Sequence, residues 1–429
     1  MMQMSSPSTL SEWLHWQENL HPVSIDLGLE RLRPVAERLG LSSLPMPVIS
    51  VAGTNGKGSS VAYLEAMLNA QGLTNASYGS PWLHTYNESV RINARAVSDQ
   101  CLIHSFERVE QALEGVTLTC FEYRTLAAVD VMINAQVDVA ILEVGLGGRL
   151  DAVNLFDAKV SIITTLGLDH QEWLGADLES IAREKAGIMR QGHPCVCADP
   201  TMISLLEPYA LEIGAVLCSA DRDYHVSRQD NSWSYQSSRF SFENLPMPAL
   251  MGSHQLYNAA GAICALTELN NPPELNTATI AKALSDVKLA GRLEFQERRS
   301  AIPDVLLDVA HNPQACKVLG EWLRDHPRQG RVLAVCGMYQ DKDPINSLLH
   351  VVPFVNEWHL GSLPAPRGAE AKVLEQVLTG YCRSGHCYET ITQAFQRACD
   401  LASEEDLVVV FGSFETVRQV SAYLSTSPK

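Results

Sequence analysis

A lysine and several hydroxyl residues lie in a glycine-rich stretch that follows a short apolar run, VISVAGTNGKGSS, at residues 48–60. A loop of this kind between a strand and a helix presents backbone N–H groups to an anion at the helix N-terminus. Lys57 is placed to reach the terminal phosphates of a nucleotide, and Ser59 to hold the accompanying magnesium ion. The usual phosphate-binding loop has its hydroxyl directly after the lysine, whereas here Gly58 intervenes. The stretch predicts a nucleotide site of unusual form, and the alternative interpretation is a plain glycine-rich turn.

A carboxylate ends a second apolar run. Glu143 closes VDVAILE, residues 137–143, where burial of a carboxylate is costly unless it is paired or bound to a metal. Enzymes with a phosphate-binding loop place an acid on a neighbouring strand to hold magnesium, so Glu143 is a predicted metal ligand. The glycines at 145–148 follow the acid with the wrong spacing for a dinucleotide site, and we interpret them as a structural turn.

Two further side chains are ambiguous from spacing alone. His170 follows the apolar run at residues 160–165, and its spacing fits either a metal ligand or a structural histidine. Lys185 lies in a predicted helix at 178–189, where the sequence favours an ordinary solvated charge.

A second pair of polar residues occurs late in the chain. Asp308 and His311 follow the apolar part of VLLDVAHNP, residues 305–313, where they could hold a nucleotide phosphate or ribose, or act as acid and base. The chain has no G-x-S-x-G motif, so a hydrolase triad lacks an obvious nucleophile.

The elements that position these residues follow one pattern. Short β-branched runs lead into glycine-containing turns and then into amphipathic helices, which predicts an α/β fold with a parallel sheet buried on both faces. Such sheets bind ligands beyond the carboxyl ends of their strands, where the polar residues lie. The pattern changes at residues 221–244, which read as a polar β-hairpin, and a second α/β series follows. We therefore predict two domains, 1–290 and 291–429.

Composition limits the partners. The 429 residues are 46% hydrophobic, and 32 basic against 49 acidic residues give a net charge of −17. This negative charge argues against a protein that binds nucleic acid or a membrane surface in general. The eleven cysteines include no C-x-x-C pair, which favours reduced thiols over a zinc site. We identify no signal peptide and no apolar run of about 20 residues, so the expected location is the cytoplasm.

Seven motifs in order make the chain similar to one known family. AGTNGKGS, GSPWLHTYNESVRIN, FEYRTLAA, EVGLGGRLDAVN, LGLDHQEWLG, EKAGIM and DVAHNP resemble the folylpolyglutamate synthase family over nearly the entire chain. The extra glycine after the lysine is that family's own form of the loop, shared in kind with the Mur ligases. The resemblance implies a Mur-ligase-like P-loop domain with a parallel sheet and a small β element, followed by a Rossmann-like C-terminal domain.

The resemblance also implies an ATP-dependent ligase that works through an acyl phosphate, with two magnesium ions and a monovalent cation as a further candidate. Lys185 would be carbamylated and would ligate magnesium through an anionic oxygen. The implied ATP-binding residues are Thr54, Asn55, Gly56, Lys57, Gly58, Ser59, Asn258, Arg292 and Asp308. The implied metal ligands are Ser59, Ser80, Glu143, His170 and Lys185. The implied catalytic residues are Lys57, His170, Lys185, Asp308 and His311.

A further detail concerns the acceptor. ENLH at residues 18–21, followed by IDLGLER, resembles the bacterial enzymes of the family that also bind dihydropteroate. The implied substrates are ATP, L-glutamate, dihydropteroate and folates, and a monomer is expected. The residues implied to contact substrate are Asn19, Leu20, His21, Thr119, Cys120, Phe121, Glu122, Leu150, Asp151 and Ala152, with Ser413 near the glutamate. The chain departs from the family pattern at Gly79, Trp82, Arg124 and Val309.

Three alternatives stay open at this stage. The chain could extend folates only, as a monofunctional folylpolyglutamate synthase. It could be a Mur-type ligase with a UDP-muramyl or other peptide acceptor, against which ENLH and FEYRT argue. It could also bind nucleotide without ligating anything, and glutamate-dependent release of phosphate would exclude that interpretation.

Overall fold

The computed structural model describes residues 7–298, 302–364 and 367–426; the first six residues of the N-terminal stretch searched for a signal peptide lie outside this description. The chain divides into two compact units. One comprises Met1–Ala249 with His254–Val287, and the other Leu250–Ser253 with Lys288–Lys429. The main division therefore comes a few residues before the predicted boundary at 290/291, and a short segment ahead of it belongs to the second unit.

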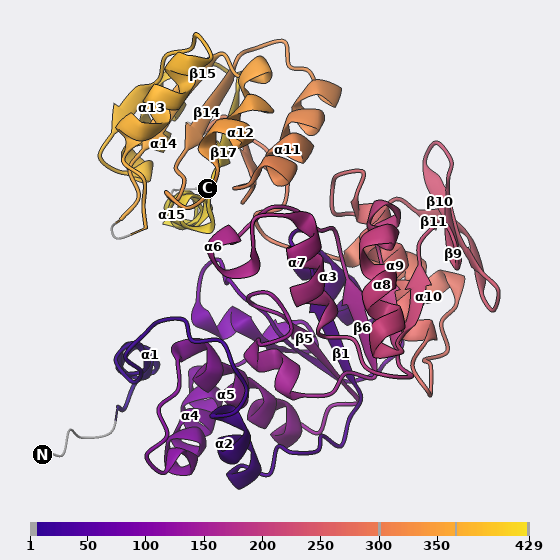
Figure 1. Ribbon diagram of the computed structural model, residues 1–429. Coiled ribbons are helices and arrows are strands. Elements are labelled where there is room, and N and C mark those ends of the chain that lie inside the picture. The colour runs from indigo at the N-terminus through magenta and orange to yellow at the C-terminus, as the bar shows by residue number, and fades with distance from the viewer. Residues whose placement is uncertain (1–6, 299–301, 365–366, 427–429) are drawn as a thin grey trace, which may run out of the picture. The chain divides into compact units, whose positions relative to one another are not determined.

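A mostly parallel sheet forms the centre of the first unit (Figure 1). Its six parallel strands are extended by two antiparallel edge strands, β3 and β4. In spatial order the strands are β4 (Arg95–Ala96), β3 (Val90–Ile92), β2 (Asn75–Tyr78), β5 (Val139–Glu143), β1 (Val48–Ala52), β6 (Val160–Ile163), β7 (Pro194–Cys197) and β8 (Val216–Ser219). Because β1 lies between β5 and β6, the three predicted strands with polar ends are direct neighbours.

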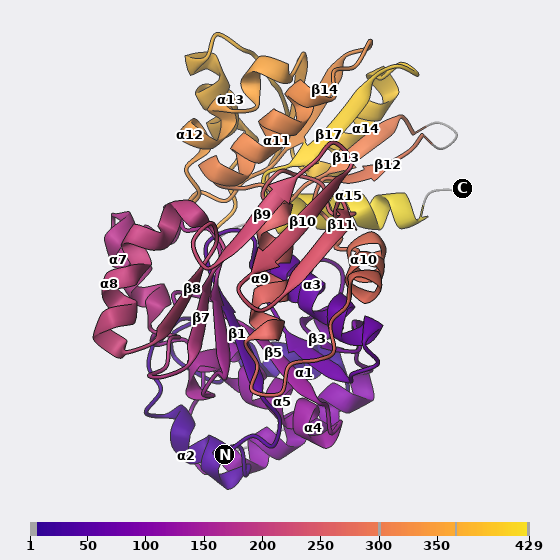
Figure 2. The ribbon, with the colours of Figure 1, turned by 90° about the vertical axis from the view of Figure 1, so that its right-hand side faces the viewer.

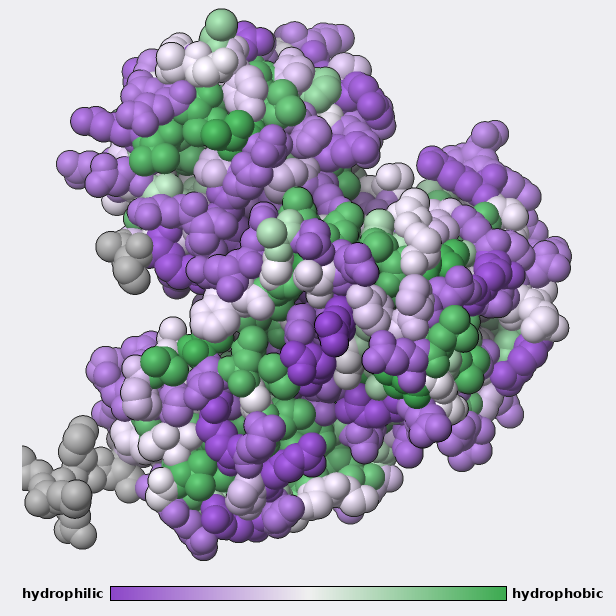
Figure 3. Space-filling model, in the orientation of Figure 1, coloured by the Kyte–Doolittle hydropathy of each residue, from purple (hydrophilic) through white to green (hydrophobic). Residues whose placement is uncertain are grey.

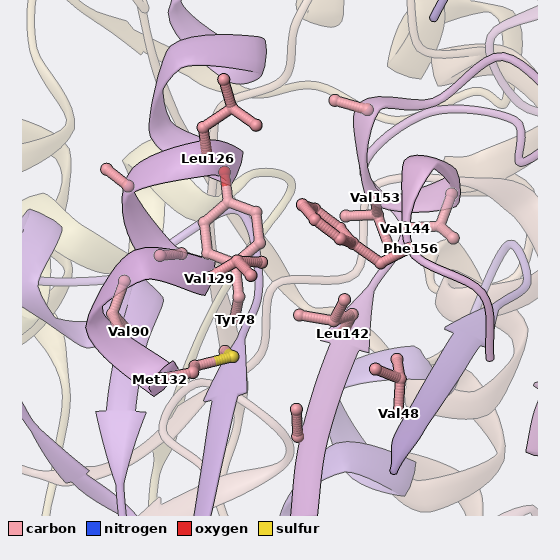
Figure 4. Packing of buried hydrophobic residues seen from close by; sticks show 14 of the residues in the cluster. Val48, Tyr78, Val90, Leu126, Val129, Met132, Leu142, Val144, Val153 and Phe156 are labelled. Atoms are coloured by element: carbon pink, nitrogen blue, oxygen red, sulfur yellow. The ribbon is translucent and has the colours of Figure 1, made fainter. Parts of the chain in front are cut away.

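Helices cover this sheet. On one side α5 packs on β2, and Figure 4 shows Leu126 and Val129 of α5 beside Tyr78, with Leu142 of β5 nearby. On α3 pack α9 and α10, which lie together in Figure 2. The helices of this unit are α1 (Leu10–Glu18), α2 (Leu32–Arg38), α3 (Lys57–Ala70), α4 (Asp99–Leu113), α5 (Cys120–Asn134), α6 (Gln171–Leu174), α7 (Leu178–Ala186), α8 (Ile203–Ile213), α9 (Gln255–Thr267) and α10 (Thr277–Asp286).

The small β element is larger than the predicted hairpin. It is a three-stranded antiparallel sheet in which β10 (Ser232–Ser237) pairs with both β9 (Tyr224–Arg228) and β11 (Ser241–Pro246). Its aromatic side chains Trp233 and Tyr235 are buried, and the third strand, β11, extends to Pro246, past the predicted end of the hairpin at residue 244.

The second unit contains a six-stranded sheet with helices around it. Its first strand runs antiparallel to the next, and the rest are parallel. In spatial order the strands are β12 (Glu294–Gln296), β13 (Asp304–Leu307), β17 (Leu407–Phe411), β14 (Val332–Cys336), β15 (Glu357–Gly361) and β16 (His386–Tyr388). The helices are α11 (Pro313–Asp325), α12 (Pro344–Leu349), α13 (Ala371–Gly380), α14 (Ile391–Leu401) and α15 (Phe414–Thr426). The predicted fold class, two α/β domains with a small β element, is confirmed.

Across the described ranges, no helix has both the length and the apolarity that crossing a membrane requires.

Candidate active site

The glycine-rich loop joins β1 to α3, as the sequence predicts, and the segment after β6 holds it in place. The backbone N–H of Thr54 donates to the carbonyl of Thr165 at 2.8 Å, and the Thr54 hydroxyl donates to the carbonyl of Gly167 at 3.0 Å. Gly53 has φ +147°, and a Cβ there would lie 1.7 Å from Oγ1 of Thr164. Only glycine fits this position, so the loop backbone can lie directly against the neighbouring strand end.

Helix α9 supports the other side of the loop. Nε2 of Gln255 donates to Oγ of Ser59 at 3.2 Å, and Nδ2 of Asn258 donates to Oε1 of Gln255 at 3.2 Å. A Cβ on Gly56 would lie 2.7 Å from Oδ1 of Asn258, so this predicted ATP-binding residue lies beside the loop. Gln255 was missed in the sequence, although its spacing of three residues from Asn258 places both on one helix face.

Two lysines converge on one backbone carbonyl. Nζ of Lys57 donates to the Gly53 oxygen at 3.0 Å and to the Thr54 oxygen at 3.3 Å. Nζ of Lys185, on α7, donates to the same Gly53 oxygen at 3.0 Å. Lys185 is 5% exposed, and its pKa is lowered to about 7, first by burial and then by the Lys57 charge. The interpretation of Lys185 as a solvated surface charge is therefore wrong.

Oxygen ligands gather at the neighbouring strand ends. Glu143 ends β5 and is 8% exposed, while Ser80 follows β2, whose Tyr78 is paired with Leu142. A Cβ on Gly79 would lie 2.7 Å from Oε2 of Glu143, so the carboxylate lies against the backbone just before Ser80. A carboxylate and a hydroxyl are donors that magnesium prefers, and these two residues fit the predicted ion.

His170 follows β6 at the same sheet edge. Its backbone is left-handed, with φ +53°, and it immediately precedes α6. Its ring is half-buried, and Nε2 lies 3.9 Å from Oδ1 of Asp169. Among the residues that the structure describes, no three His, Cys, Asp or Glu side chains form a metal cluster. A metal at this edge therefore needs hydroxyl, carbamate or phosphate oxygens in addition to Glu143 and His170.

The predicted acceptor segments are joined by Arg31, which lies in IDLGLER but was not predicted to contact the substrate. Thr119 and Glu122 form a capping box at the start of α5. The Arg31 guanidinium donates from Nε to Glu122 at 3.0 Å and from Nη1 to Asp26 at 2.6 Å. His21 contacts Asp26 at 3.3 Å. The segment around His21 and the start of α5 therefore form one network.

The other two predicted residues of the segment that contains His21 are Asn19 and Leu20, and they make different contacts. Asn19 caps the end of α1 and is exposed, and Leu20 packs partly on the core of this unit. Figure 3 shows hydrophobic side chains gathered on this face of the first unit, over the region of α1 and α5 in Figure 1.

Asp151 shapes the turn after Glu143. Its carboxylate accepts from the backbone N–H groups of Gly145 at 3.1 Å, Leu146 at 2.8 Å and Val153 at 2.9 Å. Burial raises its pKa to about 6, against the lowering effect of these N–H groups. The Phe121 ring lies against this turn, because a Cβ on Gly145 would come within 2.6 Å of it.

The neighbouring predicted acceptor residues differ in exposure. Leu150 and Cys120 are half-buried, as is Phe121, whereas Ala152 is buried. The glycine turn is thus a structural feature that brings Phe121 and Asp151 together.

In the second unit, a buried aspartate follows β13. Asp308 accepts hydrogen bonds from the N–H groups of Leu293 and Ala310, both at 2.7 Å. Burial raises the pKa of its carboxyl, and the positive charge of Arg292 opposes that rise. The Arg292 guanidinium lies over the Phe414 ring at 5.3 Å from its centroid.

His311 lies near the same ring, and Ser413 directly precedes Phe414 in the chain. Nδ1 of His311 lies 2.8 Å from the Val309 oxygen, and its ring centroid is 6.3 Å from that of Phe414. Ser413 is 1% exposed, and its hydroxyl accepts from the N–H of Thr416 at 3.0 Å. The structure therefore brings Arg292, Asp308, His311 and Ser413 together at one end of β13 and β17, with the Ser413 hydroxyl serving as a helix cap.

Family models match both parts of the chain. Residues 51–266 match the Mur ligase middle domain, and residues 291–414 match the Mur ligase glutamate ligase domain. The chain is 41% identical to the dihydrofolate synthase/folylpolyglutamate synthase of Escherichia coli strain K12, over 97% of this chain and 96% of that protein.

Solved structures agree with this match. The structure of E. coli FolC in complex with DHPP and ADP superposes with a TM-score of 0.91 at 41% identity, over 97% of this chain and 98% of that one. A bifunctional folylpolyglutamate synthase/dihydrofolate synthase with Mn, AMPPNP and L-glutamate bound superposes with a TM-score of 0.89 at 40% identity, with the same coverage. The chain therefore belongs to the dihydrofolate synthase/folylpolyglutamate synthase family of Mur ligases.

Proposed function

We propose that this chain ligates L-glutamate to dihydropteroate, forming dihydrofolate, and to the γ-carboxyl group of folates, with ATP as the energy source. The observation that carries the proposal is one sheet edge at which the glycine-rich loop, Glu143 and the buried Lys185 lie together. The relatives named above support it, because one binds DHPP with ADP and another binds AMPPNP, Mn and L-glutamate.

The chemistry has two steps. A carboxylate oxygen of the acceptor attacks the γ-phosphorus of ATP, so that a C–O–P linkage forms and ADP leaves. The amino group of glutamate then attacks the acyl carbon, phosphate leaves from the tetrahedral intermediate, and the amine loses a proton. Holding both reactants in place contributes to the rate, by about 7–11 kcal/mol in the best-oriented cases.

The loop is the proposed phosphate site. Its backbone N–H groups at 56–59 and the Lys57 ammonium would stabilise the negative charge of the transferring group. Asn258 would contact the nucleotide, since it already lies beside Gly56. In the second unit, Arg292 and Asp308 are proposed nucleotide contacts, and His311 is proposed to position the incoming amine, with Ser413 close to the glutamate.

The proposed acceptor site lies on the first unit. Its residues lie in and around the Arg31 network and the turn that Asp151 shapes: Asn19, Leu20, His21, Thr119, Cys120, Phe121, Glu122, Leu150, Asp151 and Ala152. Phe121 offers an aromatic face to a flat ring, and the Arg31 network holds the start of α5 beside it.

Magnesium is the proposed metal, and it would neutralise charge on the phosphates. Ser59, Ser80 and Glu143 would hold one ion, and His170 with a carbamylated Lys185 the second. Carbamylation fits the geometry, because an uncharged amine is the form that reacts with carbon dioxide and Lys185 is buried beside another cation. The monovalent cation stays a prediction from the family resemblance.

Glu143→Gln tests the metal ligand. The variant keeps the shape of the side chain but removes its negative charge, so we expect the magnesium concentration at half-maximal activity to rise at least about tenfold. A magnesium titration of ATP- and glutamate-dependent phosphate release measures this. Glu179→Gln, an exposed carboxylate on α7, is the matched control, and an unchanged magnesium requirement in Glu143→Gln would contradict the assignment.

The function itself is tested by offering dihydropteroate and tetrahydrofolate as separate acceptors and measuring phosphate release that depends on ATP, magnesium and glutamate. Turnover with both supports the bifunctional proposal. Turnover with tetrahydrofolate alone leaves a monofunctional folylpolyglutamate synthase. Failure with both, by a folded protein that binds ATP, contradicts a folate substrate and directs attention to other acceptors of Mur-type ligases.

We also propose that the enzyme is a cytoplasmic monomer. All eleven cysteines are free thiols, which suits a reducing compartment. Size-exclusion chromatography with light scattering tests the oligomeric state.

A further inference from the structure

One arginine of the first unit is held by aromatic rings. Arg124 lies on α5, and its Nε donates to Oε1 of the buried Gln17 at 2.7 Å. Its Cζ lies 5.0 Å from the centroid of the Tyr86 ring and 5.8 Å from that of Trp82. The two rings meet edge to face, with centroids 5.2 Å apart. These contacts hold the guanidinium plane in one orientation.

Within the described ranges, no carboxylate balances this charge. Arg124 is half-buried, yet no Asp or Glu lies within ion-pair distance of it, and its two Nη groups donate no hydrogen bond to the described residues. Other half-buried arginines of this unit differ, since Arg31 pairs with Glu122 at 2.6 Å and Arg91 with Glu65 at 2.8 Å. A partly desolvated cation with unused donors is a receptor for an anion.

The position of Arg124 relates it to the acceptor site. It follows Cys120 by four residues and Phe121 by three, so the three side chains lie on one face of α5. Phe121 in turn lies against Tyr78 of β2, with ring centroids 5.9 Å apart. Trp82 comes two residues after Ser80, the proposed metal ligand. The guanidinium therefore lies on the same face of α5 as the proposed acceptor residues Cys120 and Phe121.

The acceptors differ in the anions they offer. Dihydropteroate has one carboxylate, and that group reacts. A glutamylated folate has the reacting γ-carboxylate and also an α-carboxylate on each glutamate, which does not react. A planar guanidinium with two free Nη groups matches a carboxylate in a bidentate arrangement, whereas the pterin ring is uncharged at neutral pH.

We propose that Arg124 binds a non-reacting α-carboxylate of glutamylated folates and so sets the preference of the enzyme between folates and dihydropteroate. The inference rests on the proposed function, because it assumes that both acceptors bind to the first unit. Trp82 and Tyr86 are positioning residues, which act by holding the guanidinium.

The test compares acceptors in Arg124→Gln. We expect the KM for tetrahydrofolate to rise about 10- to 100-fold, as for loss of a charge-assisted pair, while the KM for dihydropteroate rises less than about threefold. Arg124→Lys keeps the positive charge but loses the bidentate geometry of the guanidinium. Its KM for tetrahydrofolate should therefore lie between those of the wild type and of Arg124→Gln. Arg95→Gln, an exposed arginine of β4, is the matched control, and thermal unfolding verifies that each variant is folded.

The outcomes separate the inference from the proposed function. Equal rises in KM for both acceptors would place Arg124 on the ring that they share, and no rise for either would make it a structural residue; both overturn the inference. Equilibrium binding of the two ligands, followed by tryptophan fluorescence, gives the same comparison without turnover. A wild-type protein that neither binds nor turns over either acceptor contradicts the proposed function, and the inference falls with it.

Discussion

Lys185→Ala is expected to lower kcat by about 100- to 1,000-fold, the size of effect seen when a group that stabilises transition-state charge is lost. Lys185 is buried and its Nζ donates to the Gly53 oxygen of the phosphate loop. An anionic carbamate at that point would hold a metal against the transferring phosphate. The variant removes both the amine and the proposed carbamate, so we expect the chemical step to be affected more than acceptor binding. Steady-state kinetics with tetrahydrofolate measure the change.

The charges around Lys185 explain why a carbamate suits this position. Lys57 and Lys185 both donate at 3.0 Å to one carbonyl oxygen, so two ammonium groups there would repel each other with little water between them. In the proposed modification, reaction of the Lys185 amine with carbon dioxide would form an N–C bond and release a proton, and the like-charge pair would become an attractive one.

Three controls make the Lys185 prediction specific. Lys185→Arg keeps a cation but cannot form the carbamate, and it should be as inactive as Lys185→Ala. Arg183→Ala, exposed on the same helix, should retain activity. Labelled carbon dioxide should give a carbamate 13C resonance in the wild type and none in Lys185→Arg. Activity of Lys185→Ala within about threefold of the wild type would contradict this role.

Much of the active-site edge was predictable from local sequence. The runs at 48–52, 137–143 and 160–165 are rich in β-branched residues and lead into glycine turns, and each contains a strand of the central sheet. Because parallel strands end at one edge, the loop, Glu143 and His170 were expected to share it. The order β5-β1-β6 is a tertiary result that local patterns do not contain.

Lys185 shows where local patterns fail. Its helix of nine residues carries several charges, so a lysine there resembles a surface residue. Lys185 is nevertheless buried, and the Gly53 carbonyl to which it donates lies 132 positions away in the chain. The same holds for Arg31, whose partner Glu122 is 91 positions away. Long-range pairing of this kind leaves no periodic signal.

In the second unit, local sequence predicted the position of polar residues but not the contacts of their side chains. The motif DVAHNP predicted polar residues after a strand, and Asp308 and His311 do follow β13, yet the contacts of their side chains depend on neighbours from elsewhere. Asp308 is fixed by the N–H groups of Leu293 and Ala310, and the Ser413 hydroxyl is taken up by a helix cap. The sequence motif therefore predicted where the polar residues lie, while the hydrogen bonds of Asp308 and Ser413 decide which of their atoms remain for a ligand.

Lys57→Ala is the second prediction with a large effect, with kcat lowered by about 100- to 1,000-fold and a higher KM for ATP. The Lys57 ammonium contacts the carbonyls of Gly53 and Thr54 within its own loop, and in the proposed mechanism it would stabilise the charge that develops on the transferring phosphate. Lys57→Arg should restore little, because the close approach of a compact ammonium is lost. Lys159→Ala, an exposed lysine ahead of β6, is the control.

The double variant Lys57→Ala/Lys185→Ala distinguishes a shared site from two separate ones. If the two side chains act on one transferring phosphate, the second substitution removes an interaction that the first has already weakened. The loss in kcat should then be well below the product of the two single losses, by at least about tenfold. Their common hydrogen-bond acceptor, the Gly53 oxygen, makes this coupling the expected result. Losses that multiply fully would show that the lysines act independently, and would contradict the single phosphate site proposed for this sheet edge.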